Sequence, residues 1–97
     1  MIINFTPQRR DDTLSLEKTS GDRLRINGEL FNFNTLNDGD TIPADSIPCE
    51  WIIGDVTRVD GHVHVTLILP HGPNPTHVQA FPSPITVTED GPINVDA

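Results

Sequence analysis

The sequence predicts an all-β fold, a small open barrel or sandwich of about six to eight strands, mostly antiparallel. Three observations favour this fold. Short runs alternate between apolar and polar residues, and Asn-Gly and Asp-Gly pairs separate them. Nine prolines and seven glycines are spread along the chain. No window carries apolar residues at helical spacing over three turns, so helices should be rare.

The first strands are expected at residues 2–5 and 13–19. The former is an apolar run that ends at Thr6 and Pro7. The latter alternates and places Leu14 and Leu16 on one face. Both segments should therefore contribute to the core.

The clearest local signal is Asn27 followed by Gly28, between two alternating runs. This pair favours a two-residue type I′ turn, because both central residues need a positive φ. The turn sets Ile26 opposite Glu29 and Leu24 opposite Phe31. One face of this first hairpin then carries Leu24, Ile26, Phe31 and Phe33, and the other carries Arg23, Arg25, Leu30 and Asn32.

A second hairpin is predicted around Asp60 and Gly61, with strands at residues 51–59 and 62–69. The same turn logic pairs Val59 with His62, Thr57 with His64 and Asp55 with Thr66. Its core face should hold Ile52, Val56, Val63, Val65, Leu67 and Leu69. At the far end Trp51, Ile53 and Ile68 make the other face apolar too, so another segment or a partner should cover it.

The rest of the chain is rich in proline. Residues 70–77 should form an exposed loop, because missing N–H groups exclude them from a central strand. Residues 78–81 are expected to pair briefly, and 85–88 to form the last strand. A turn is predicted at 89–92.

Length and composition predict a single β domain over residues 1–92, followed by a tail at 93–97. The net charge of −8 disfavours nucleic-acid binding. The one basic pair, Arg9 and Arg10, precedes two aspartates and indicates a solvated loop. Cys49 is the only cysteine, which excludes an internal disulfide. The chain has neither a long apolar run nor a secretory pattern, so we expect a cytosolic protein without membrane contact.

All four histidines fall between positions 62 and 77. His62 and His64 share one face of a strand, a spacing that metal sites use, with Asp55 facing them and His71 or His77 able to fold back. A zinc or iron module using His62 and His64 is therefore the alternative function. The other interpretation is a set of polar residues on a solvent face.

No catalytic motif is recognisable, since a Gly-x-Ser-x-Gly elbow and a phosphate-binding glycine loop are both missing. We therefore expect a protein that is not an enzyme and has no cofactor. Candidate partner contacts are Trp51, His71, Pro73, Pro75 and His77, in and beside the proline-rich loop. For Trp51 the alternative is that it plugs one end of the barrel or sandwich.

Three segments carry a resemblance, IPCEWIIGDV at 47–56, LILPHGP at 67–73 and FPSPITV at 81–87. Over roughly residues 47–92 the chain resembles small proteins encoded in the tail-gene region of bacteriophages and prophages. The resemblance implies a structural or accessory tail protein without catalytic residues. Its partners would be other tail proteins or further copies of itself, in the host cytoplasm during assembly and in the virion tail. His62-Val63-His64 matches iron-binding tail-tip proteins only in its spacing.

Overall fold

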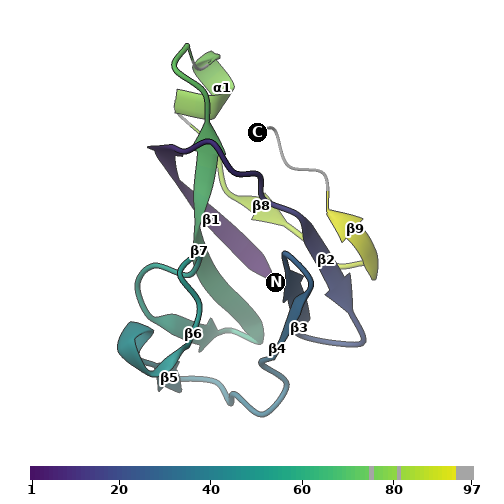
Figure 1. Cartoon of the computed structure of the whole chain (residues 1–97). Helices are drawn as coiled ribbons and strands as arrows, with labels where there is room; N and C mark the ends of the chain where they lie inside the picture. The colour runs from purple at the N-terminus through teal and green to yellow at the C-terminus, as the bar shows by residue number, and fades with distance from the viewer. Residues whose placement is uncertain (75, 81, 94–97) are drawn as a thin grey trace.

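The computed structural model describes residues 1–74, 76–80 and 82–93, and this part of the chain folds into two β-sheets (Figure 1). Its nine strands are β1 (Ile2–Arg9), β2 (Leu16–Thr19), β3 (Arg23–Ile26), β4 (Glu29–Asn32), β5 (Thr41–Ile42), β6 (Val56–Val59), β7 (His62–His71), β8 (Ile85–Thr86) and β9 (Gly91–Ile93). Two short helices accompany them, the 3₁₀-helix η1 (Ala44–Ser46) and α1 (His77–Ala80). The predicted all-β class is confirmed, with nine strands where six to eight were expected.

The sheets have the strand orders β5-β6-β7-β1-β8 and β4-β3-β2-β9. Apolar side chains of both sheets form one buried cluster, as expected for a small sandwich. Its most buried members are Ile3, Leu24, Ile26, Val56, Val63, Val65 and Leu67. Burial of side chains of this size stabilises a fold by about 1.5–3 kcal/mol each.

Both predicted hairpin turns are confirmed. Asn27 and Gly28 have φ values of 48° and 86°, and Asp60 and Gly61 have values of 51° and 81°. The first hairpin has the predicted register, since Ile26 pairs with Glu29 and Leu24 with Phe31. In the second hairpin the expected pairs Val59–His62 and Thr57–His64 are also present.

The predicted pairing of Asp55 with Thr66 is wrong. Thr57 pairs with His64, and the next pair along the hairpin is Ile52 with Leu67. Between these two pairs, the first strand therefore has two residues more than the second. The backbone turns out of the ladder at Gly54, which has a φ of 78°. A slip of two residues keeps each side chain on its original face. The predicted core face, residues 52, 56, 63, 65, 67 and 69, is therefore buried throughout.

Two expectations based on proline are also wrong. β1 continues through Pro7, and the centrally placed β7 contains Pro70, in a parallel ladder that joins Pro7 to Leu69 and Gln8 to Pro70. The Arg10 N–H donates a hydrogen bond to the His71 carbonyl, so the backbone groups of these two residues point toward the ladder. Backbone groups alternate in direction along a strand, and those of Pro7 and Pro70 therefore point away from it. Their missing N–H groups therefore cost the ladder no hydrogen bond.

The C-terminal part of the chain also differs from the expectation. Residues 77–80 form α1 where a brief strand was predicted, although position 81 lies outside the described residues. The predicted strand at 85–88 is the shorter β8, which pairs with Ile2 and Ile3. The predicted turn continues into β9, which pairs with β2, so Ile93 belongs to the sheet and not to a tail. Residues 94–97 lie outside the described part.

Two cationic side chains on the core faces lie at the edges of the hydrophobic cluster. Lys18 lies on the same face of β2 as the buried Leu16, is 6% exposed, and pairs with Asp90 at 3.0 Å. Arg58 is opposite the buried Val63 and reaches from β6 to the other sheet. The thin apolar core is therefore flanked by ion pairs within the described residues.

Candidate functional site

Strands β1 and β7 extend beyond their neighbours at one end of the molecule (Figure 1). On one side β8 pairs with β1 only through Ile2 and Ile3. On the other side the pairing of β7 ends with the Ile52–Leu67 bridge and the bond from the Ile68 N–H to the Trp51 carbonyl. Beyond these points, in the described residues, the two strands pair only with each other.

We call this projection the arm, and define it as residues 7–9, 69–74 and α1. The helix α1 packs against β7 beside the end of that strand (Figure 1). With the arm, the molecule measures 40 × 27 × 24 Å.

The base of the arm is held by Trp51 and Arg10. Trp51 is 6% exposed, and the Arg10 guanidinium lies 4.3 Å from the centroid of its ring. Arg10 also binds Asp12 with two bonds, from Nε at 2.8 Å and from Nη2 at 2.6 Å. Glu50 lies 3.6 Å from the same guanidinium. The hydrogen bond from Arg10 lowers the pKa of Asp12 below its ordinary value.

A hollow of about 270 Å³ lies beside this base, lined by residues 10–13 and 70–72. His71 is on its wall, with Nδ1 2.7 Å from the Gly72 carbonyl oxygen. A carbonyl only accepts hydrogen bonds, so Nδ1 carries the proton and Nε2 is left to bind another group. Charged, imidazole and proline side chains thus meet beside the base of the arm.

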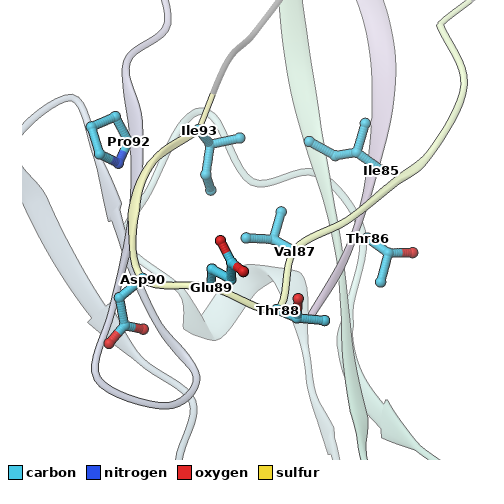
Figure 2. A pocket seen from close by; sticks show the side chains of 8 residues that line it. All are labelled: Ile85, Thr86, Val87, Thr88, Glu89, Asp90, Pro92 and Ile93. Carbon is cyan, nitrogen blue, oxygen red and sulfur yellow. The ribbon is translucent and has the colours of Figure 1, made fainter.

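A second hollow, of about 340 Å³, lies within the bend from β8 to β9. Figure 2 shows Ile85, Val87 and Ile93 turned toward its interior together with the Glu89 carboxylate. Asp90 turns outward and pairs with Lys18. The bend therefore brings three apolar side chains and one carboxylate to the same hollow.

The candidate metal ligands His62 and His64 lie on the outer face of β7, at the end away from the arm. His62 is exposed and His64 half-buried. Asp55, expected to face them, instead accepts a hydrogen bond from the Ala44 N–H at 3.0 Å. In residues 1–74, 76–80 and 82–93 no three histidine, cysteine or acidic side chains form a group able to hold a metal ion.

The structure distributes the predicted contact residues unevenly. His71, Pro73 and His77 lie on the arm, where Pro73 and His77 are exposed. Pro75 lies outside the described residues. Trp51 is buried. At the apolar end of the second hairpin Trp51 and Ile68 are covered as predicted, at 6% and 7% exposed, while Ile53 is only partly buried.

Arg10 and Asp12 are site residues that sequence reasoning placed in a solvated loop. Arg10 is half-buried, and its contact with Trp51 joins segments 41 positions apart. The signal present in the sequence was an arginine two residues before an aspartate, which allows a local ion pair. Nothing local indicates the tryptophan.

Among the described residues no helix is long and apolar enough to cross a membrane. In comparisons with known proteins, no family model, curated protein or solved structure matches the chain.

Proposed function

We propose that the chain is a non-enzymatic structural or accessory protein of a phage or prophage tail, and that it acts through protein–protein contacts made by the arm. The observation that carries this proposal is the projection of β1 and β7 beyond both neighbouring strands, with three of the candidate contact residues on it. Other tail proteins are the proposed partners. The host cytoplasm during assembly, and then the virion tail, are the proposed locations.

The construction of the arm supports a contact role. Pro7 and Pro70 lie in its two strands, and Pro73 follows in the loop. Proline restricts the backbone before binding, so less conformational entropy is lost when a partner docks. The contact of Arg10 with Trp51 fixes the base from which the arm projects. A partner would therefore meet a preorganised surface.

The resemblance supports the tail assignment. The range over which it holds, roughly residues 47–92, contains β6, β7, α1 and β8, and therefore one strand of the arm and the loop that follows it. Acidic side chains elsewhere hold loops in place. Asp38 accepts a bond from the Gly61 N–H at 2.8 Å, and Asp40 accepts one from the Asn37 N–H at 3.0 Å. These two carboxylates are therefore engaged in holding loops.

Co-purification tests the proposal. The untagged chain is expressed from its own locus during phage or prophage induction, and particles and assembly intermediates are separated on a density gradient. We expect the chain to sediment with particles or with another tail gene product. Its absence from both fractions, with the chain remaining free in the lysate, would contradict the proposal.

A further inference from the structure

In the described part of the chain no strand pairs with the outer edge of β4, and we propose that this edge pairs with the same edge of a second copy of the chain. The two β4 strands would run antiparallel around a two-fold axis at Phe31. The two four-stranded sheets would then form one continuous sheet across the dimer. This proposal shares with the proposed function only the idea that the chain acts through protein contacts. The dimer would form without any contact by the arm and without other phage proteins.

The other edge strands of the described sheets are short and bordered or interrupted by proline. β5 has two residues and precedes Pro43, and β8 has two residues and follows Pro84. β9 has three residues with Pro92 in the middle. These are features by which proteins keep sheet edges from pairing. β4 has four residues and no proline, so it is the edge best able to accept a further strand.

The backbone of β4 offers a regular set of hydrogen-bonding groups. Glu29 and Ile26 flank the two-residue turn and bond to each other, and the Phe33 N–H bonds to the Asp22 carbonyl at 2.9 Å. The odd-numbered positions therefore point toward β3. The N–H and C=O groups of Leu30 and Asn32 point outward, where the described part of the chain gives them no backbone partner.

This pattern is complementary to itself. A two-fold axis at Phe31 sets Leu30 of each copy opposite Asn32 of the other. The interface therefore contains two such pairs, both at hydrogen-bonded positions. The two Phe31 residues then meet at the non-hydrogen-bonded position, where facing side chains are closest. Both apolar residues of the strand thereby gain contacts.

The exposure and charge of the edge favour the second copy as the occupant. Leu30 is 47% exposed, one of two large apolar side chains so exposed in the described residues. The directly opposed pairs would be Leu30 with Asn32, Phe31 with itself and Glu29 with Phe33. Like charges are not opposed in any of them, so the net charge of −8 is not concentrated at the interface.

Sedimentation equilibrium from micromolar to millimolar concentration tests this. We expect a transition from the 10.7 kDa monomer to twice that mass. Leu30→Lys should weaken the dimer by about tenfold or more, because the two copies would each bring an ammonium group to the same face of the interface, at diagonal positions. Val59→Lys is the matched control, because Val59 is 51% exposed and lies on β6, which is paired on both sides.

Hydrogen exchange identifies the interface. In the dimer the amides of Leu30 and Asn32 should exchange at least about tenfold more slowly than in the monomer. The amides of β3 report that each variant is folded. A chain that stays monomeric at millimolar concentration would overturn the proposal, as would equal weakening by both lysine variants or unchanged exchange at Leu30 and Asn32. Co-purification with particles is independent of all three outcomes.

Discussion

Arg58 Nη2 donates a hydrogen bond to Asp22 Oδ2 at 2.8 Å, and this bond joins strand β6 of one sheet to the residue that precedes β3 of the other. The same guanidinium donates to the carbonyls of Phe33, Leu36 and Gly61. The side chains of Arg58 and Asp22 are only 13% and 23% exposed. The Arg58 side chain therefore links the two hairpins and the loop between them through hydrogen bonds.

Arg58→Ala should lower the free energy of unfolding by about 3 kcal/mol. Asp22 and the carbonyls of Phe33 and Leu36 lose their donor there, and all three bonds are partly buried. Urea unfolding measures this. Arg25→Ala is the control, since Arg25 lies 3.7 Å from Glu17 and both side chains are more than 40% exposed. It should cost less than about 0.5 kcal/mol. Equal losses in the two variants would contradict the role given to Arg58.

Lys18 and Asp90 should respond asymmetrically to substitution. Asp90→Asn leaves the buried ammonium without its anion and should destabilise the fold by about 1–2 kcal/mol. Lys18→Met keeps the volume and removes the buried charge, so stability should stay within about 1 kcal/mol of the wild type. Thermal and urea unfolding compare the two. A larger loss in the methionine variant would show that the ion pair stabilises the fold by itself.

Gly61→Ala should destabilise the second hairpin by about 1 kcal/mol, because Gly61 has a φ of 81° that alanine adopts at a cost. Space is not the reason, since a Cβ there would meet no atom within 4 Å. Gly72→Ala is the matched control, also with open space but without a positive φ. It should be neutral within about 0.5 kcal/mol. Equal effects in urea unfolding would exclude the turn as the cause.

Arg10→Gln should raise the pKa of Asp12 toward its ordinary value of 3.8, because the hydrogen bond that lowers it is lost. In the wild type, the stability from this pair is present above about pH 4 and is lost as the pH falls through the lowered folded pKa. Carboxyl NMR titration measures the shift.

In the same Arg10→Gln variant, the fluorescence emission of Trp51 should move to longer wavelength, because its ring becomes more exposed to solvent. An unchanged spectrum would place Arg10 away from the ring.

Zinc or iron should leave the melting temperature of the untagged protein unchanged. His62 and His64 supply two ligands on one face, and the described residues add no third one to make a site. Calorimetry with each metal, on the wild type and on His62→Ala, measures this. A metal-dependent rise in melting temperature that His62→Ala abolishes would instead support the metal-binding module.

Both hairpins were predictable because each register depends on a local turn. Asn27 with Gly28 and Asp60 with Gly61 determine which residues oppose each other. The core face of the second hairpin was also right, although the extension to Asp55 and Thr66 was not. Two additional residues at Gly54 and Asp55 shifted the pairing without changing faces.

The parallel ladder of β1 and β7 was not predictable in the same way. It pairs residues that are 62 positions apart, such as Ile2 with His64, and no turn specifies such a pair. Pro7 and Pro70 suggested loops, yet proline interrupts hydrogen bonding on one side of a strand only. The arm, and with it the contact of Arg10 with Trp51, depends on this ladder. That is why the sequence could suggest candidate contact residues in the loop but not the base on which the loop stands.

The contact role of the arm can be measured by quantitative mass spectrometry of purified phage particles that carry the wild-type chain or one of two variants. Pro73→Asp changes the exposed arm, and Val59→Asp makes a comparable change on β6, outside the arm. We predict that the wild type and Val59→Asp are retained in particles or tail intermediates, while Pro73→Asp is depleted although it is folded and expressed. Equal amounts of all three chains in the particles, or none of any, would contradict a contact role for the arm.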